Sequence, residues 1–224
     1  MIRISALTRI VTFASPLMVL GSCATTDGPA SFAAGDPATG IAAEAPGPQF
    51  PVMMKVGGCK MVRRNGHILL SAPTNDRSLI QTREEYRPPF VVRLRAKIDT
   101  ASIRLYYNAG MVILNWKVHP SQLRFHDPVN DKMSAFNDKG TIELNTFHDI
   151  AWEIYPDGTR LVLNDKEVMT KLGDYGDLVA PIGVGPAFGS VIMLESFSVH
   201  ELQGTLEGTQ GASHGIHQTC IARW

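Results

Sequence analysis

Apolar and polar side chains alternate with a period of two residues along most of residues 52–203. This period is typical of β-strands with one buried and one solvated face, and no helix-length pattern interrupts it. Turn signals such as Asn65-Gly66 and Asp157-Gly158 supply the positive φ that tight hairpins need. Many short strands at this spacing predict an all-β, antiparallel jelly-roll β-sandwich. The strands are expected at Met53–Val56, Cys59–Arg63, His67–Ala72, Ser78–Thr82, Phe90–Ile98, Ile103–Tyr107, Met111–Val118, Gln122–Asp127, Thr141–Leu144, His148–Tyr155, Arg160–Leu163, Glu167–Met169 and Val191–His200.

The middle of this pattern, Ser102–Pro128, predicts a three-stranded antiparallel meander with two unlike faces. Apolar side chains alternate with polar ones in its first and last strands, so one face belongs to the core and the other is polar. Tyr and Trp rings offer flat surfaces to sugar rings, while Arg, Asn and Asp groups form hydrogen bonds to hydroxyls or carboxylates. The alternative is a plain water-facing surface whose cross-strand pairs add modest stability. The predicted ligand-binding residues of the polar face are Arg104, Tyr106, Asn115, Trp116, Arg124, His126 and Asp127.

The register of the middle strand decides where Trp116 lies. In one register, Val112, Leu114 and Trp116 share the core face. Ile113 and Asn115 then face outward, and Asn115 joins the site. In the other register, Trp116 itself lies on the polar face and offers its ring to a ligand. The alternation alone allows both registers.

The first two dozen residues have the organisation of a secretion signal. A cationic lead precedes the apolar run Ile10–Leu20, which is too short to span a membrane comfortably. The run ends in Leu20-Gly21-Ser22-Cys23, which resembles the lipobox of bacterial lipoprotein signal peptides. The resemblance implies a signal peptide over residues 1–22, cleavage before Cys23, and membrane attachment through acyl chains on Cys23. The alternative is an ordinary secretory signal with a chance cysteine.

A tether is expected between this signal and the folded domain. Residues 23–51 are rich in Ala, Gly and Pro and contain no Lys or Arg. Such a composition buries too little apolar surface to offset the entropy of ordering, which predicts a disordered tether. Residues 52–203 have a length that a single hydrophobic core supports, so they are expected to form one β-sandwich domain. Residues 204–224 are expected to form a C-terminal tail.

The segment Phe147–Val168 resembles the strand pair near the end of concanavalin A-like lectin/glucanase and laminin G-like domains. An aromatic-His lead is followed by an alternating strand, the Asp157-Gly158 hairpin and a second strand. The last turn, Asn164-Asp165-Lys166, departs from the family, which usually has glycine there. The resemblance implies a concanavalin A-like β-sandwich over Val52–Gln203. It implies little about function, because the superfamily includes lectins, glycosidases, lyases and adhesion modules.

The residues offer weak support for catalysis. Glycoside hydrolysis needs two carboxylates on one surface, and the glucanases of the family carry them in a Glu-X-Asp-X-X-Glu run that this sequence lacks. Asp149 and Glu153 are the best available pair, and solvated strand charges explain them more simply. The sequence has no metal-ligand spacing, phosphate loop or nucleophile elbow, so no catalytic residue, metal or cofactor is expected. Equal numbers of basic and acidic residues, 21 each, argue against a nucleic-acid partner.

Two cysteines, Cys59 and Cys220, remain once Cys23 is acylated. Because unpaired thiols tend not to persist in an oxidising compartment, a Cys59–Cys220 disulfide is expected. Such a bond would hold the C-terminal tail against the Gly57-Gly58 corner. The alternative is two independent thiols, one in the first strands and one on a frayed tail.

These features favour a lipid-anchored protein of the bacterial cell envelope whose β-sandwich binds a carbohydrate or envelope glycan without catalysis. Ala24, and not Asp, follows the lipobox cysteine, which favours the outer membrane in the sorting logic of Gram-negative lipoproteins. The alternatives are a glycoside hydrolase or polysaccharide lyase of the same fold, and a structural envelope module that docks a protein partner.

Overall fold

The computed structural model describes residues 50–74 and 77–212. Fourteen strands and one short helix form in these residues. The predicted signal peptide, nearly all of the tether, Cys23 and Cys220 lie outside the described residues. The elements are β1 (Met53–Val56), β2 (Lys60–Arg64), β3 (His67–Ser71), β4 (Leu79–Tyr86), β5 (Phe90–Ile98), β6 (Ile103–Tyr107), β7 (Gly110–Leu114), β8 (Leu123–His126), β9 (Met133–Phe136), β10 (His148–Tyr155), β11 (Gly158–Leu163), β12 (Lys166–Leu172), β13 (Ala180–Gly185), β14 (Val191–Glu201) and α1 (Leu206–Ala212).

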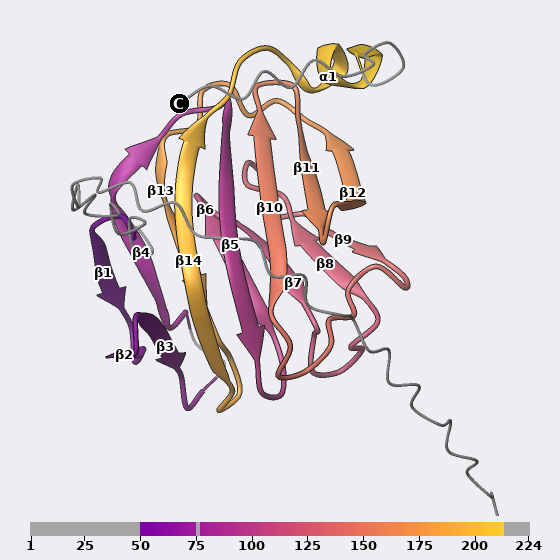
Figure 1. The fold of residues 1–224 in the computed structure, drawn as a ribbon. Helices are drawn as coiled ribbons and strands as arrows, with labels where there is room; N and C mark the ends of the chain where they lie inside the picture. Colours follow the sequence, from indigo (N-terminus) through magenta and orange to yellow (C-terminus); the bar gives the residue numbers. More distant parts are fainter. Residues whose placement is uncertain (1–49, 75–76, 213–224) are drawn as a thin grey trace, which may run out of the picture. The chain divides into compact units, whose positions relative to one another are not determined.

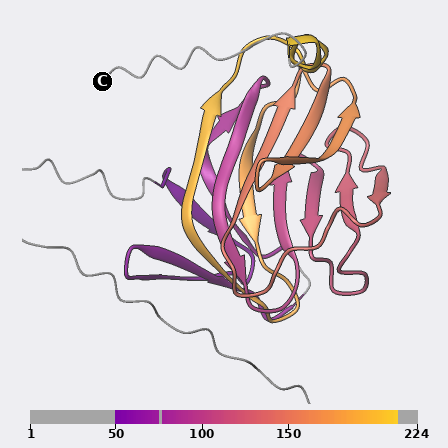
Figure 2. The same cartoon turned by 45° about the vertical axis from the view of Figure 1, so that its right-hand side comes forward.

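The strands form two antiparallel seven-stranded sheets that pack face to face. Sheet A has the order β1-β4-β13-β6-β7-β8-β9, and sheet B has the order β12-β11-β10-β5-β14-β3-β2. Figure 1 looks onto sheet B with sheet A behind it, and Figure 2 turns the two layers toward an edge-on view. The core between the sheets includes fully buried Trp152, Phe125 and Phe197. The jelly-roll β-sandwich predicted from the alternation is therefore confirmed.

The meander forms as predicted, as β6, β7 and β8 in the middle of sheet A. In the pairing of β6 with β7, Leu105 lies opposite Val112, and Val112 lies opposite Phe125 of β8. All three side chains are buried in the core. The alternate positions of these strands therefore point away from sheet B, as a period of two requires.

Two strands of sheet A were not expected from the alternation, β9 and β13. β13 lies between β4 and β6 although Pro181 and two glycines within it are typical of a turn. The register of its pairing with β4 shifts between Pro181 and Gly183, and such an irregularity accommodates the missing N–H of proline. The strand expected at Thr141–Leu144 is wrong. Ile142 is buried there, but it anchors an irregular segment, and a single buried residue resembles a short strand in sequence.

Part of the expected C-terminal tail is folded against the sandwich. Helix α1 follows β14, and the buried side chain of Leu206 packs where a Cβ on Gly158 would stand. The Asp157 carboxylate accepts hydrogen bonds from the backbone N–H groups of Leu206 (2.7 Å) and Glu207 (3.2 Å). These bonds satisfy donors that the first helical turn leaves open. In the sequence, Asp157 was recognised only as part of the β10–β11 hairpin turn, and its second role, as acceptor for the first N–H groups of α1, was not predicted.

Cys59 lies just before β2 and is buried, and burial raises the pKa of its thiol. No disulfide forms among the described residues. The expected partner, Cys220, lies outside them, so the Cys59–Cys220 disulfide stays a prediction. In Figure 1, β2 lies at the lower end of the sandwich and α1 at the upper end.

Candidate functional site

Four of the predicted ligand-binding residues share the outer face of sheet A, which we call face A. Arg104 of β6 lies opposite Ile113 of β7, which lies opposite Arg124 of β8. One row further along the sheet, Tyr106 and His126 lie on either side of the intervening strand β7 in the same way. Because side chains of one row point to one side of a sheet, these four residues lie on one surface.

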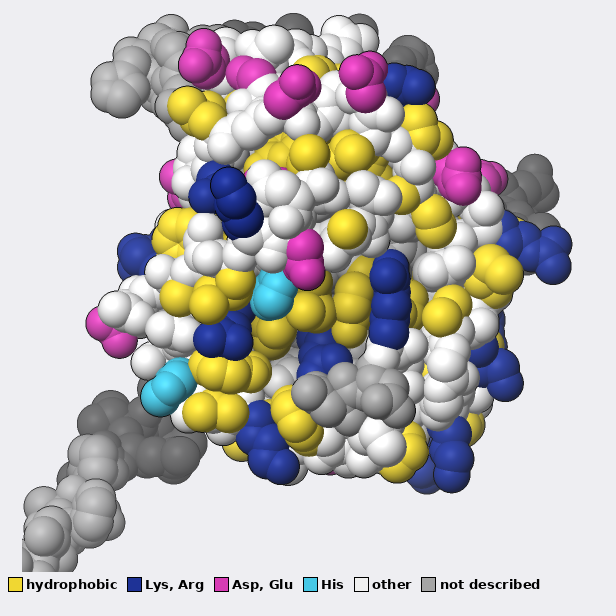
Figure 3. All heavy atoms as spheres, turned by 180° about the vertical axis from the view of Figure 1, so that it is seen from behind, with side chains coloured by type: hydrophobic (Ala, Val, Ile, Leu, Met, Phe, Trp, Pro, Cys, Tyr) yellow, Lys and Arg dark blue, Asp and Glu magenta, His cyan; other side chains and the backbone are white. Residues whose placement is uncertain are grey.

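A shallow hollow of about 300 Å³ opens on face A around Tyr106, and we call it the Tyr106 hollow. Figure 3 shows this face of the molecule, with a histidine, an acidic side chain, basic side chains and apolar side chains around the hollowed centre. The Arg77 guanidinium carbon lies 5.4 Å from the centroid of the Tyr106 ring. Arg77 also donates a hydrogen bond to the Asn108 carbonyl oxygen (3.2 Å), which holds it at the rim. The hollow is lined by Arg77, Arg104, Tyr106, Ala109, Met111, His126 and Asp131.

Two glycines of β13 allow this surface to form. Gly183 pairs with Tyr106, and Gly185 pairs with Arg104. A Cβ on Gly183 would collide with the side chain of Leu79 and lie 3.3 Å from the Tyr106 Cβ. Leu79 therefore fills the space beside Tyr106 and is fully buried on the outer side of the sheet. Gly183 and Gly185 were not selected from sequence, because the alternation predicted no strand in their segment.

His126 is paired with an acidic residue that the sequence analysis did not select. Its Nδ1 atom lies 3.1 Å from an Oδ1 atom of Asp131, in the turn between β8 and β9. Asp131 has a φ of 53°, a conformation that Asp tolerates better than most residues, and its N–H donates to the Asp127 carbonyl oxygen (2.8 Å). The turn thus aims a carboxylate at the histidine. The Asp-Pro-Val-Asn-Asp run after His126 was the available signal.

Trp116 lies on face A, although Val112 and Leu114 are in the core. Strand β7 ends at Leu114, and Asn115 has a φ of 51°, so the alternation breaks before Trp116. The Trp116 ring lies under the Arg124 guanidinium carbon, 3.4 Å from the ring centroid. Neither of the two registers considered from sequence describes this arrangement, because both assumed a strand that continues through Trp116.

Asn115 and Asp127 have their side chains bound to other parts of the protein. The Asn115 side-chain amide donates to the Thr100 carbonyl oxygen (2.9 Å), and its residue is nearly fully buried. Asp127 accepts hydrogen bonds from the Val129 N–H (2.9 Å) and from the Tyr175 hydroxyl (3.1 Å). Burial, and next the Asp127 charge, raise the pKa of Tyr175. The structure thus places Asp127 away from the Tyr106 hollow.

A second hollow, of about 480 Å³, lies at the end of the sandwich beside Phe188, and we call it the Phe188 hollow. Phe188 belongs to the loop between β13 and β14 and was not selected from sequence. Its ring centroid lies 5.6 Å from the guanidinium carbon of Arg104 and 4.9 Å from Nζ of Lys117. Because Arg104 also lines the Tyr106 hollow, the two hollows meet at this pair. The Phe188 hollow is lined by Thr100, Ala101, Asn115, Lys117, Pro120, Leu144 and Phe188.

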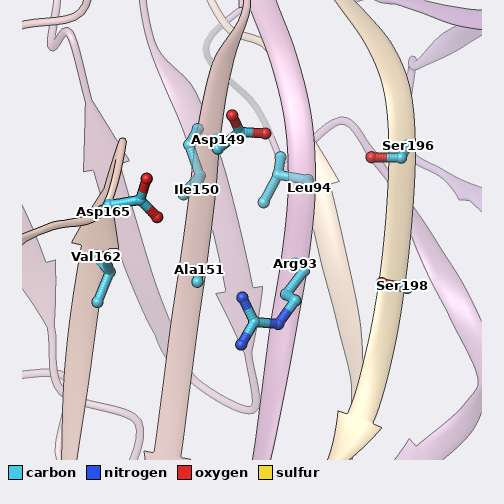
Figure 4. A pocket seen from close by; sticks show the side chains of 9 residues that line it. All are labelled: Arg93, Leu94, Asp149, Ile150, Ala151, Val162, Asp165, Ser196 and Ser198. Atoms are coloured by element: carbon cyan, nitrogen blue, oxygen red, sulfur yellow. The ribbon is translucent and has the colours of Figure 1, made fainter. Parts of the chain in front are cut away.

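A third hollow, of about 370 Å³, lies on the outer face of sheet B, which we call face B. Figure 4 shows its lining, with Arg93 reaching from β5, and Asp149 and Asp165 on the neighbouring elements, around the small side chain of Ala151. No aromatic ring lines it. The hollow therefore lacks the flat apolar surface on which a sugar ring stacks. The remaining lining residues are Leu94, Ile150, Val162, Ser196 and Ser198.

The two carboxylates considered for hydrolysis both belong to face B. Asp149 accepts a hydrogen bond from Arg95 (2.9 Å). Glu153 is buried and forms an ion pair with Arg160, with 2.6 Å between Nη2 and Oε2. Burial alone would lower the pKa of Arg160, and the Glu153 carboxylate raises it. Each carboxylate is therefore bound to an arginine of the same sheet.

The described residues include no cluster of three or more His, Cys, Asp or Glu side chains placed to hold a metal ion. No helix within residues 50–74 and 77–212 has the length and hydrophobicity needed to cross a membrane.

Comparison with known proteins identifies the fold. No protein-family model and no curated protein matches the sequence. The carbohydrate-binding module CBM66 from Bacillus subtilis superposes with a TM-score of 0.54 at 12% identity, over 67% of this chain and 96% of the module. A Bacillus subtilis protein of unknown function with a galectin-like fold gives a TM-score of 0.57 at 9% identity, over 66% of this chain and 89% of that one. The Bacillus licheniformis β-glucanase gives 0.52 at 9% identity, over 71% of this chain and all of the enzyme.

Identities this low establish a shared fold and no shared activity. The jelly-roll fold implied by the Phe147–Val168 resemblance is confirmed.

Proposed function

We propose that this protein is a lipid-anchored cell-envelope protein that binds a glycan on face A, without catalysis. The observation that carries the proposal is the Tyr106 hollow, in which the largely buried Tyr106 ring lies beneath Arg77 among hydrogen-bonding side chains. Sugar recognition needs both elements, a flat apolar surface for the ring and fixed polar groups for the hydroxyls. The glycan-binding and glucan-degrading proteins among the structural neighbours are compatible with this use of the fold.

The distribution of carboxylates supports binding more than hydrolysis. Asp131 is the one carboxylate among the described residues that line the Tyr106 hollow, and it is paired with His126. Glycosidases generally need two carboxyl groups about 5–10 Å apart across the scissile bond. Asp149 and Glu153, the best pair in the sequence, lie on the other sheet.

Binding and turnover can be measured on the same samples. We expect calorimetric titration with a panel of oligosaccharides to give a binding isotherm, and incubation with the same panel to release neither reducing ends nor unsaturated sugars. Release of reducing ends would make the protein a glycoside hydrolase, and ultraviolet absorbance from unsaturated ends would make it a lyase. A panel without any binding at millimolar protein would favour a structural module that docks a protein partner.

The lipid anchor is a separate part of the proposal and rests on the Leu20-Gly21-Ser22-Cys23 lipobox. Replacement Cys23→Ala removes the acyl acceptor, so the variant should be found uncleaved or in the soluble fraction. Fractionation and mass measurement of the mature chain check this. A processed Cys23→Ala protein that stays with the outer membrane would contradict the anchor.

A further inference from the structure

We infer that the ligand of face A is an anionic saccharide, with carboxylate or sulfate groups, which extends from the Tyr106 hollow to the Phe188 hollow. This inference rests on the proposed glycan-binding function and names its ligand class. Its basis is the way in which the basic side chains of face A are held.

Each basic side chain around the two hollows lies against an aromatic ring. Arg77 lies over Tyr106, and Arg124 lies over Trp116. Arg104 and Lys117 lie on the same Phe188 ring. A ring attracts a cation without cancelling its charge, so the positive charges of Arg77, Arg124 and Lys117 remain available to a ligand.

The ion pairs among the described residues do not include Arg77, Lys117 or Arg124. Asp131 is the one carboxylate among the described residues that line the Tyr106 hollow, and it pairs with His126. Lys117 is the one charged residue among the described residues that line the Phe188 hollow. In the described lining of the two hollows, basic side chains therefore outnumber carboxylates.

The same separation of charge is visible on the molecular surface. In Figure 3, most of the acidic side chains gather at the upper end of this face, whereas basic side chains surround the hollow and its lower side. A basic recess with acidic groups kept at a distance attracts anions and raises their local concentration. Guanidinium groups also match carboxylates and sulfates in shape, because two N–H donors of one plane reach two oxygens.

Phe188 lies where the two hollows meet, so a saccharide that occupies both hollows must be long enough to pass the Phe188 ring. It has a φ of 56°, which is rare for a bulky side chain. The Phe188 N–H donates to the Thr74 carbonyl oxygen (3.1 Å), and the Gly189 N–H donates to the Ala72 carbonyl oxygen (2.8 Å). These bonds hold the loop in its unusual conformation and keep the ring close to both Arg104 and Lys117. A saccharide that spans both hollows passes this ring and meets the cations that lie against it.

The inference can be tested by titrating the full-length protein, purified in detergent, with matched ligands. The probes are an oligogalacturonate, the same oligosaccharide after reduction of its carboxyl groups, a sulfated galactan oligosaccharide, and polyglutamate as an anion without sugar. We expect the oligogalacturonate or the sulfated galactan to bind at least about tenfold tighter than the carboxyl-reduced chain and polyglutamate. Preference between the first two identifies the anionic group.

The variants Arg77→Gln and Lys117→Gln should each weaken binding of the anionic oligosaccharide about three- to tenfold. Their matched control is Arg93→Gln, which removes an exposed arginine from face B and should change neither affinity nor stability. Phe188→Leu should weaken binding of a tetrasaccharide and leave binding of monomeric galacturonate unchanged, because only the longer ligand crosses the ring.

The outcomes separate this inference from the proposed function. Equal binding of the carboxyl-reduced chain would overturn the anionic ligand and leave glycan binding intact. Equal binding of polyglutamate would show attraction of any polyanion, and would overturn it too. If no saccharide binds, both the inference and the proposed function fail.

Discussion

The outer faces of the two sheets share an alternating strand pattern, but their basic side chains have different interaction partners. On face B, Arg95 lies between the carboxylates of Asp149 and Glu195, and Arg160 is paired with Glu153. On face A, the basic side chains lie on aromatic rings, as Arg124 does on Trp116. Carboxylates thus hold Arg95 and Arg160 of face B, although Lys97 of the same face lies on the Phe147 ring. On face A, no ion pair among the described residues includes Arg77, Lys117 or Arg124.

The interaction partners of the arginines help to distinguish a polar surface that stabilises the fold from one that binds a ligand. Both faces contain arginines at alternate strand positions, so the residue types do not separate them. The carboxylate partners do, because a carboxylate partner lowers the gain from any incoming anion, whereas an aromatic partner, which both faces also contain, leaves that gain available. Face B is therefore expected to contribute stability, and face A is expected to contribute affinity.

The largest effect on this comparison is expected from Glu153→Gln on face B. The substitution leaves the largely buried Arg160 guanidinium without its carboxylate, which should lower the free energy of unfolding by about 3 kcal/mol. Urea denaturation measures this loss, and glycan affinity should stay unchanged. The control is Glu195→Gln, which removes one exposed partner of Arg95 and should cost less than about 1 kcal/mol. Lost affinity with unchanged stability would instead move the binding site to face B.

The next largest effect is expected on face A from Trp116→Leu. The ring holds the Arg124 guanidinium in place, so its removal should weaken glycan binding about tenfold, which corresponds to about 1.4 kcal/mol. Stability should change little, because Trp116 is only partly buried. Calorimetric titration and thermal unfolding of the same sample measure the two effects. A large fall in melting temperature at unchanged affinity would make Trp116 structural.

A smaller effect is expected from truncations of single side chains on the two faces. Arg124→Ala and His126→Ala should shift the free energy of unfolding by less than about 0.5 kcal/mol and weaken glycan binding several-fold. Arg95→Ala is the matched change on face B, and should cost about 1 kcal/mol of stability without changing affinity. Equal destabilisation by all three, with equal affinity, would remove the distinction between the faces.

The smallest effect is expected from two buried tyrosines, Tyr107 and Tyr175, whose ionisation changes stability only at high pH. Burial raises the pKa of Tyr107, and burial together with Asp127 raises the pKa of Tyr175. An unfolded tyrosine ionises near pH 10, so above that pH the unfolded chain loses protons that the folded protein keeps. The stability contributed by these tyrosines should thus be complete below about pH 10 and fall above it. Melting temperatures from pH 7 to 11 check this, and a fall between pH 7 and 9 would contradict it.

The alternation predicted most strands because polar side chains alternate with buried apolar ones along them, even where the outer face is itself buried, as in β6. It failed at β13, where Pro181, Gly183 and Gly185 have no side chains that alternate. The strand is held by its neighbours β4 and β6, which pair with it on both sides. Such pairing is a tertiary effect that local sequence does not encode. Ile142 shows the reverse error, since it is buried without being in a strand.

The candidate site was predicted in part for the same reason. Arg104, Tyr106, Arg124 and His126 occupy strand positions, so a period of two placed them on one face. Arg77, Asp131 and Phe188 come from turns and loops, and no periodicity brings them to that face. Their positions depend on how the loops fold over the sheet.

The amino-acid sequence by itself determined the two-layer β architecture, because burial of every second side chain leaves few other solutions for a chain of short strands. It also determined which strand residues face outward. Only the tertiary structure decided that the two outer faces differ, because several arginines have partners from distant parts of the chain. Arg95 pairs with Asp149, 54 residues away in the sequence, and Arg104 lies on a ring from a loop more than eighty residues away. Such long-range contacts depend on the packing of the whole domain, which no local pattern contains.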